Sequence, residues 1–434
     1  MILEEQRPSQ VAEWERWLGT GTLVPVFQPI LSSESTAIFG YEVLGRIETN
    51  RGLESLGSFF LAVDESRGSK QDFVRTSELF RIKKKIDREI RYQALLKFKE
   101  EAPPETCLFI NISPHLMYDL LHSFPTKLPF TIQKVRELGI DPSRIVIEIT
   151  EERFEHNLEI LKPILNLYRK EGFRIAVDDA GSEASNLDRI GLFHPEIIKV
   201  DLQMLRRSTF SRNFKEILLN LSKLGESLGS SLLFEGIETK DELYNSLNYG
   251  ARYIQGYHFS KPEREFSKRF QYRQEMSHAL EYFHKRKNEE METQIQWEMK
   301  WKEKLSQVSL GFTCIDGVWE CDLSNQEAIS KDSDFFRMYI TNPFGFQVSP
   351  NYIHDHKKGL IADYSYLGKN WSWRPYFFEH IHKSRTSKDA WAISPIYHDI
   401  SENVMLRTFS RDFGENLILF IDIILSREGK FLPS

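Results

Sequence analysis

Short apolar runs rich in β-branched residues alternate with longer amphipathic stretches over residues 22–262, and this alternation constrains the fold more than any other feature. It is typical of βα units around a parallel sheet. Eight runs are predicted strands: residues 23–29, 37–44, 107–111, 145–148, 174–178, 197–200, 231–235 and 253–255. Helices are predicted over residues 81–100, 158–171, 210–228 and 240–249. The sequence therefore predicts an α/β fold with a (β/α)8 TIM-like barrel.

Polar residues stand at the carboxyl ends of nearly all these strands. They are Glu42, Asn111, Glu148, Asp178 with Asp179, Lys199, Glu235 and Gln255. In a (β/α)-barrel the carboxyl ends of the strands form the active-site face. We therefore expect these side chains, although far apart in the sequence, to meet in one pocket.

A cluster of carboxylates in a cleft repels itself unless cations neutralise it, and oxygen ligands favour Mg²⁺ or Mn²⁺. The adjacent acids Asp178 and Asp179 allow one carboxylate to bridge two ions, the arrangement used in phosphodiester hydrolysis. Lys199 and Arg46 are nearby cations suited to phosphoryl oxygens or to an attacking water. The pattern predicts a two-metal site.

Each of these residues, taken singly, also has a structural interpretation. A strand-terminal acid is a common N-cap of the following helix. Asn111 stands just before Ser113 and Pro114, where a turn can begin, and Lys199 can pair with Asp201 on a surface. It is the joint pattern that favours a site.

The chain after the barrel divides into two further parts. Residues 264–305 are highly charged, lack Pro and Gly, and carry apolar residues on a helical rhythm, which predicts one long connecting helix. This helix either lies on a domain surface or forms a self-association seam. In residues 306–434, Gly, Asn, Asp and aromatic residues interleave with short strand-like runs, which predicts a smaller α+β domain. The predicted domains are residues 1–265, 266–305 and 306–434.

Trp371, Trp373, Arg374 and Tyr376 form an aromatic cluster in the smaller domain. Arginine and aromatic rings together can bind a small-molecule effector. The alternative is that the rings pack a small core while Arg374 pairs with an acid such as Asp363 or Glu379.

Composition limits the partners. A net charge of −6 gives no broad basic footprint for a DNA or RNA duplex. Three cysteines, an odd number, favour a reducing compartment. No signal peptide or long apolar run is visible, so we expect a cytoplasmic protein without a membrane partner.

The barrel motifs resemble those of the EAL-domain family of cyclic di-GMP phosphodiesterases and receptors. They are Phe27-Gln28-Pro29, Gly40-Tyr41-Glu42-Val43-Leu44-Gly45-Arg46, Asn111-Ile112-Ser113-Pro114, Glu148-Ile149-Thr150-Glu151, Asp178-Asp179-Ala180-Gly181, Ile198-Lys199-Val200-Asp201, Glu235-Gly236-Ile237-Glu238 and Gln255-Gly256-Tyr257. The resemblance implies hydrolysis of cyclic di-GMP to linear pGpG, and it implies a homodimer.

The resemblance also implies roles for individual residues. Glu42, Asn111, Glu148 and Asp178 would bind one metal, and Asp178 and Asp179 a second. Lys199 would orient the attacking water, Glu235 would be a metal ligand or the general base, and Glu151 would stabilise the loop after Asp179. The residues implied to contact or enclose the dinucleotide are Gln28, Leu44, Arg46, Asp201, Glu238 and Gln255.

The later segment Lys369-Asn370-Trp371-Ser372-Trp373-Arg374-Pro375-Tyr376-Phe377 resembles the YkuI type of EAL protein, in which a long helix joins the barrel to a PAS-like domain. Its Arg-Pro-Tyr-Phe string is similar to a motif of small-molecule sensor domains. The loop over residues 180–186 departs from the family pattern. Two hypotheses follow, a metal-dependent phosphodiesterase regulated by the PAS-like domain, and a catalytically weak or inactive receptor that signals to a partner. A third, weaker one is an interaction protein with an inert barrel.

Overall fold

The computed structural model describes twelve stretches of the chain. They are residues 19–57, 59–60, 73–121, 128–149, 158–178, 186–308, 310–322, 332–355, 359–386, 391–399, 404–414 and 416–427. The chain divides into two compact units, Met1–His284 and Lys285–Ser434, and the long helix α11 (Arg273–Ser306) contributes residues to both. Each unit is described below by itself.

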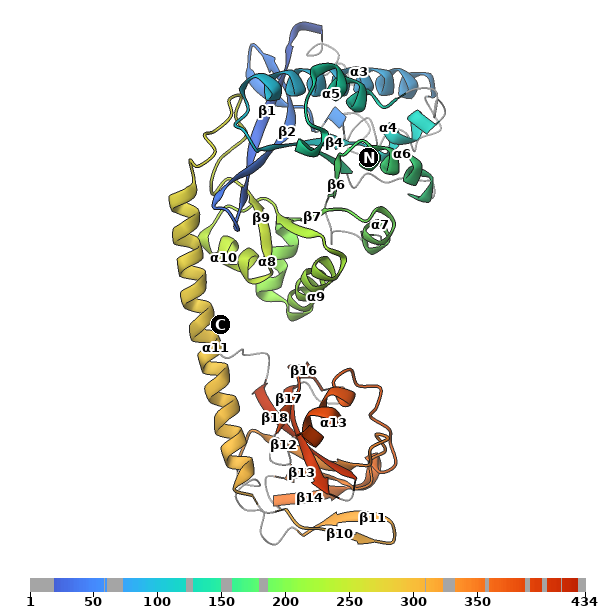
Figure 1. The fold of residues 1–434 in the computed structure, drawn as a ribbon, viewed down its shortest axis with the longest axis vertical. Coiled ribbons are helices and arrows are strands. Elements are labelled where there is room, and N and C mark those ends of the chain that lie inside the picture. Colours follow the sequence, from blue (N-terminus) through green and yellow to red (C-terminus); the bar gives the residue numbers. More distant parts are fainter. Residues whose placement is uncertain are drawn as a thin grey trace, which may run out of the picture. The chain divides into compact units, whose positions relative to one another are not determined.

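The first unit is a closed barrel (Figure 1). Its strands are β1 (Thr22–Ser32), β2 (Ala37–Thr49), β4 (Cys107–Ile112), β5 (Ile145–Ile149), β6 (Arg174–Val177), β7 (Ile197–Val200), β8 (Ser231–Phe234) and β9 (Ala251–Gln255). The strands follow one another in the order β1-β9-β8-β7-β6-β5-β4-β2, and β1 also pairs with β2, which closes the ring. The eight-stranded barrel predicted from the sequence is confirmed.

The first strand of the barrel is antiparallel to both of its neighbours, whereas an all-parallel sheet was predicted. The reason is the short connection: only residues 33–36 join β1 to β2. A parallel pair needs a crossover of a dozen or more residues, so these strands can only form a hairpin. A further short strand, β3 (Gly52–Ser55), extends the sheet from β2 and was not predicted.

Helices follow most of the parallel strands and cover the barrel (Figure 1). They are α3 (Phe73–Glu101), α4 (Pro114–Leu121), α5 (Phe130–Leu138), α6 (Lys162–Lys170), α7 (Asn186–Phe193), α8 (Leu202–Phe210), α9 (Arg212–Leu228) and α10 (Lys240–Asn248). The short helices α4, α5, α7 and α8 were not predicted, because eight or nine residues carry too little periodicity to distinguish them from loops.

The long helix starts at Arg273, nine residues after the predicted start. The backbone just before it pairs with the barrel instead: Glu263 exchanges hydrogen bonds with Phe27, and the Arg269 carbonyl accepts one from Ile38. The Phe266 ring packs against Phe27 at 4.2 Å between centroids. This segment is therefore held against the barrel by its backbone, with bends and turns in place of the predicted helix.

The second unit is built on an antiparallel sheet of seven strands. They are β12 (Phe335–Thr341), β13 (Asn351–Asp355), β14 (Gly359–Asp363), β15 (Ala392–Ile393), β16 (Tyr397–His398), β17 (Val404–Gly414) and β18 (Leu417–Arg427). A hairpin of β10 (Phe312–Ile315) and β11 (Val318–Cys321) and the helix α13 (Phe377–Thr386) complete it. Trp301 and Leu305 of α11 pack into its core. The smaller α+β domain is confirmed.

Membrane-spanning capacity can be judged from the helices. None of those in the described ranges combines the length and the apolar character needed to cross a bilayer.

Gly256 packs against backbone and gives a test of the barrel. A Cβ at Gly256 would lie 2.0 Å from the Ile237 carbonyl oxygen. Gly256→Ala should therefore lower the free energy of unfolding by about 3 kcal/mol or more. The matched control is Gly191→Ala, on an open face of α7 with no atom within 4 Å of the new Cβ. It should raise stability by about 0.5–1 kcal/mol, as urea denaturation would measure, and equal effects would contradict this packing.

Candidate functional site

Strand geometry directs the predicted site residues into one mouth of the barrel. Successive side chains on a strand point to opposite faces, so residues two apart share a face. Apolar residues that fill the barrel interior include Phe109, Val146, Ala176, Ile197 and Leu233. The residue two positions after each of these is, in the same order, Asn111, Glu148, Asp178, Lys199 and Glu235. The site is therefore the next layer of the barrel core, formed by polar side chains.

Lys199 lies at the centre of this layer and is fully buried. Its Nζ contacts an oxygen of four acids: Glu235 Oε2 at 3.0 Å, Asp178 Oδ1 at 3.3 Å, Glu42 Oε1 at 3.6 Å, and Glu148 Oε1. The surface pairing of Lys199 with Asp201, an alternative left open by the sequence, is wrong. Four carboxylates around one ammonium leave an excess of three negative charges when all are ionised.

A second set of contacts holds the Glu42 carboxylate from the other side. Asn111 Nδ2 donates to Glu42 Oε1 at 2.9 Å, and Gln255 Nε2 donates to Glu42 Oε2 at 2.6 Å. Gln255 Nε2 also contacts Gln28 Oε1 at 3.1 Å, and Gln28 Nε2 donates to the Ser260 carbonyl. The structure thus brings Gln28, Glu42, Asn111 and Gln255 into one network. No local sequence motif marks the hydrogen bond from Gln28 to the Ser260 carbonyl, so this contact was not predicted from the sequence.

Burial and mutual repulsion set the protonation of the cluster. Burial, with repulsion from neighbouring acids, raises the pKa of Glu148 and of Glu235 well above the usual range of a carboxyl. Burial acts on Asp178 in the same direction but is outweighed by Lys199 and by hydrogen bonds, so the pKa of Asp178 is lowered. Burial opposes the charge on Lys199, yet the four acids raise its pKa well above normal. The excess negative charge of the cluster can thus be neutralised either by protons or by bound cations.

Several buried oxygens of the site have no hydrogen-bond partner among the described residues. They are Asn111 Oδ1, Glu148 Oε2, Glu235 Oε1 and Gln255 Oε1. A buried acceptor without a partner is costly, and a divalent cation is a natural partner for carboxylate and amide oxygens. In the described ranges, no group of three or more His, Cys, Asp or Glu side chains is arranged as a ready metal site. The Lys199 ammonium lies among the acids of the cluster instead. The donor set fits an oxygen-coordinated cation.

Four other predicted residues lie outside this cluster of contacts. Asp201 caps α8 by accepting from the Gln203 amide, as the structural interpretation of strand-end acids anticipates. Glu238 is half-exposed and pairs with Arg206 at 2.9 Å. Leu44 and Arg46 follow Glu42 on the same face of β2 and are partly exposed. Burial lowers the pKa of Arg46, although Tyr257 and Glu42 act in the opposite direction.

Asp179 and Glu151, with the divergent loop from residue 180 to residue 185, lie outside the described residues. Their predicted roles as second-metal ligand and loop-stabilising residue therefore stay predictions.

The aromatic cluster of the second unit surrounds Arg374. The guanidinium carbon lies 5.0 Å from the Trp373 ring, 5.7 Å from Trp371 and 4.8 Å from Tyr397. Pairing with Asp363 or Glu379 is not observed: Asp363 accepts from the Ser365 amide, and Glu379 pairs with Lys383. Trp373 is largely exposed. Among the described residues, Arg374 is thus held by aromatic rings and not by an acid.

A buried polar network lies behind this cluster, and sequence reasoning missed it. Arg337 donates to Asp422 and to Asp399, each at 2.7 Å, and Thr408 donates to Asp422 at 2.6 Å. Tyr397 contacts Thr408 at 2.8 Å and lies under Arg374. The available signal was Asp422 itself, a lone acid within the apolar run of β18.

A barrel of this fold, with acids, an asparagine and a lysine gathered at the carboxyl ends of its strands, defines a protein with a candidate site for divalent cations and phosphate esters. The chain belongs to the EAL-domain family, because the EAL domain model matches residues 11–262. A second model, the EAL-domain associated signalling protein domain, matches residues 266–427.

Known proteins match this chain either along both of its parts or over about half of its length. The uncharacterised EAL-domain protein YkuI of Bacillus subtilis (strain 168) is 33% identical over 402 residues, which is 92% of this chain and 94% of YkuI. The crystal structure of YkuI in complex with substrate c-di-GMP and calcium matches with a TM-score of 0.78 at 32% identity, covering 93% of this chain and 97% of that one. The probable cyclic di-GMP phosphodiesterase PdeI of Escherichia coli (strain K12) is 30% identical over 56% of this chain and 29% of PdeI.

Removing the central ammonium tests the electrostatics of the site. Lys199→Met leaves four acids without their shared cation, so we expect a loss of about 3–5 kcal/mol in the free energy of unfolding at neutral pH without added metal. The control is Lys223→Met, at an exposed position of α9, which should change stability by less than about 0.5 kcal/mol. Chemical denaturation measures both. A Lys199→Met variant as stable as the control would show that the acids do not depend on Lys199.

His380 in α13 gives a test by pH in the second unit. The ring is 1% exposed, and its Nδ1 lies 2.6 Å from Ser410 Oγ. Burial lowers the pKa of His380 from 6.5 to about 4. Between these values the unfolded chain binds a proton that the folded chain does not, so stability present above pH 6.5 is lost as the pH falls toward 4.

We expect His380→Phe to reduce this pH-dependent loss of stability by on the order of 3 kcal/mol. Urea denaturation at several pH values between neutral and 4 measures it. His382→Phe, at an exposed position of the same helix, should keep the wild-type slope. If the His380 variant keeps it as well, the histidine is not the group that titrates.

Proposed function

We propose that the chain binds cyclic di-GMP at the acidic mouth of the barrel and hydrolyses one phosphodiester, giving linear pGpG, with Mg²⁺ or Mn²⁺. The observation that carries this proposal is the buried cluster of four acids around Lys199. In this cluster one oxygen each of Glu148 and Glu235 has no hydrogen-bond partner among the described residues. The YkuI complex with substrate c-di-GMP and calcium supports the choice of ligand. Curated relatives named as cyclic di-GMP phosphodiesterases, such as PdeI, support the reaction.

Glu42, Asn111, Glu148 and Asp178 are the residues we propose as ligands of one metal, with Asp178 and Asp179 for a second. Their oxygens are the hard donors that Mg²⁺ and Mn²⁺ prefer. When bound, such ions polarise a phosphoryl oxygen and lower the pKa of a water molecule.

Glu235 is our candidate for the general base. Its side chain is 22% exposed, the most open of the four acids around Lys199, so it is the one that a ligand can approach most easily. Its raised pKa makes the ionised form a stronger proton acceptor toward an attacking water. Lys199, with its raised pKa, would stay protonated and hold that water and the acids in position.

The remaining predicted residues would bind and enclose the dinucleotide. Gln255 donates to Glu42 and to Gln28, and Arg46 offers a cation at the mouth for a phosphate. Leu44, Asp201 and Glu238 would complete the pocket, and Glu151 would stabilise the loop after Asp179. We also propose that the chain acts as a cytoplasmic homodimer and that an effector near Arg374 regulates the barrel.

A receptor without turnover is the second candidate function. It is favoured by the loop over residues 180–186, which follows Asp179 and departs from the family pattern. Such a receptor would bind cyclic di-GMP and signal to a partner. An inert barrel, the third hypothesis, would not bind the dinucleotide at all.

A turnover assay separates these functions. Purified full-length protein with cyclic di-GMP and Mg²⁺ or Mn²⁺ should produce pGpG, and Glu42→Ala should lower the rate at least about 100-fold because a metal ligand is lost. The control is Glu226→Ala, at an exposed position of α9, which should keep the full rate. Chromatography of the nucleotides measures each.

Two other outcomes would contradict the proposed hydrolysis, and they can be told apart. Tight cyclic di-GMP binding by calorimetry, without pGpG under either metal, would refute the enzyme and establish the receptor. Absence of binding would refute both.

A further inference from the structure

The turn that follows β9 carries an aromatic side chain at the mouth of the barrel. Both ends of this turn are bonded to the candidate site. Gln255 Nε2 donates to Glu42 Oε2 at 2.6 Å, and the Ser260 carbonyl accepts a hydrogen bond from Gln28 Nε2 at 3.2 Å. Tyr257 lies between these two contacts in the sequence. It therefore stands on the rim, beside residues that the proposed ligand would meet.

The backbone around Tyr257 is fixed against the neighbouring strand end. The Ile237 amide donates to the Gln255 carbonyl at 3.0 Å, and the His258 amide donates to the Ile237 carbonyl at 2.8 Å. Gly256 lies against the same Ile237 backbone, with no room for a side chain. A ligand that contacts the Tyr257 ring would therefore have little backbone freedom to restrict.

Tyr257 differs from the next two residues in the direction of its side chain. Phe259 is buried and its ring packs against Tyr272, while His258 Nε2 lies 3.3 Å from Glu275 Oε1 of α11. Tyr257 is 54% exposed. Its ring is thus open to contact by a ligand at the mouth, whereas the two neighbouring rings are used in packing.

Two cations lie near the Tyr257 ring. Lys261 Nζ lies over the ring, 5.7 Å from its centroid, which leaves the other face for a different partner. Burial lowers the pKa of Arg46, and the nearby Tyr257 hydroxyl acts against this change. An aromatic face beside cationic side chains is the combination that binds nucleotides, because the base stacks on the ring while the cations attract phosphate.

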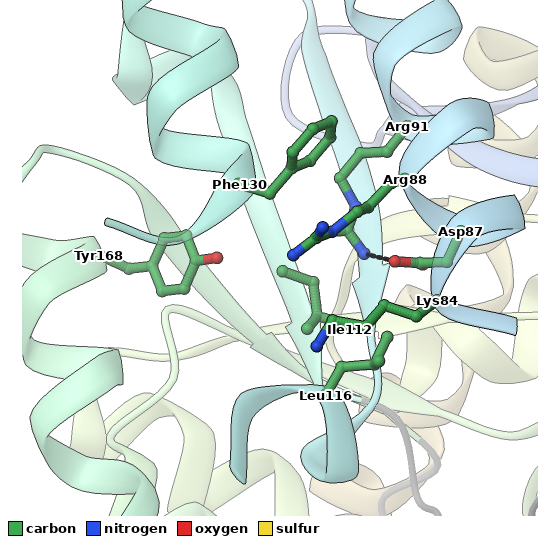
Figure 2. Close-up of a pocket in the computed structure, with 8 residues that line it drawn as sticks. All are labelled: Lys84, Asp87, Arg88, Arg91, Ile112, Leu116, Phe130 and Tyr168. Carbon is green, nitrogen blue, oxygen red and sulfur yellow. Dashed lines mark hydrogen bonds and ion pairs between the residues drawn. The ribbon is translucent and has the colours of Figure 1, made fainter. Parts of the chain in front are cut away.

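Phe130 and Tyr168 show the contrast with an interior position. They line a small pocket beside α3 (Figure 2). The pocket encloses about 20 Å³, enough for one water-sized group. A purine base cannot enter it, so these two rings contribute to packing and not to base recognition.

We propose that Tyr257 stacks on one guanine base of cyclic di-GMP. This inference rests on the proposed function and adds to it a residue that recognises a base, beside the residues proposed for the metal ions and the phosphates. A purine covers more of a tyrosine ring than a pyrimidine does. Tyr257 would therefore also favour cyclic di-GMP over cyclic di-UMP.

Calorimetry on the full chain in the presence of calcium, the metal of the YkuI complex, tests this role. We expect Tyr257→Ala to weaken cyclic di-GMP binding at least about tenfold, because a stacked base loses its platform. Tyr257→Phe, which keeps the ring, should bind within about threefold of the wild type. The control is Phe344→Ala, which removes a ring that is 75% exposed in the second unit and should leave the affinity unchanged.

The same titrations with cyclic di-UMP separate stacking from a structural effect. The wild type should prefer cyclic di-GMP, and Tyr257→Ala should reduce this preference, since the loss falls mainly on the purine ligand. Chromatography after each titration shows whether the dinucleotide is intact.

The outcomes distinguish this inference from the proposed function. If the wild type does not bind cyclic di-GMP, the proposed function fails and the stacking role falls with it. If the wild type binds but Tyr257→Ala binds equally well, or loses the same factor for both dinucleotides, only the stacking role is overturned. A Tyr257→Phe variant as weak as Tyr257→Ala would overturn it too, because the ring would then not be the group that binds.

Discussion

The structure of the first unit depends on a buried lysine surrounded by acids. Lys199 contacts Glu42, Glu148, Asp178 and Glu235 in the interior of the barrel. Removing these groups from water is costly, and one ammonium cannot balance four carboxylates. Burial together with this imbalance raises the pKa values of Glu148 and Glu235, and one oxygen of each has no hydrogen-bond partner in the part of the chain that the structure describes. The imbalance is also what makes the site suited to divalent cations.

Much of this site could be predicted because strand geometry links sequence to position. The eight runs show β-propensity, and a (β/α)-barrel brings all strand ends to one rim. Glu42 and Gln255 could therefore be expected to meet, and they do, at 2.6 Å. The four contacts of Lys199 could not be predicted, because the sequence gives the face on which a side chain lies but not its rotamer or its partners.

The parts that prediction missed depend on long-range packing. The helix α11 starts late because residues before Arg273 bond to β1 and β2, and nothing in their own sequence shows this. The Arg337 network joins three strands and the segment carrying Asp399, and only the lone Asp422 marks it in the sequence.

The central claim is that the acids of the barrel mouth bind divalent cations together with cyclic di-GMP. A crystal structure of the full chain grown with Mn²⁺ and cyclic di-GMP tests it most directly, because anomalous scattering locates manganese without ambiguity. The account predicts at least one anomalous peak within coordination distance of Glu42, Asn111, Glu148 and Asp178, with the dinucleotide beside it. A map without such a peak, in which Lys199 still contacts all four acids, would contradict it.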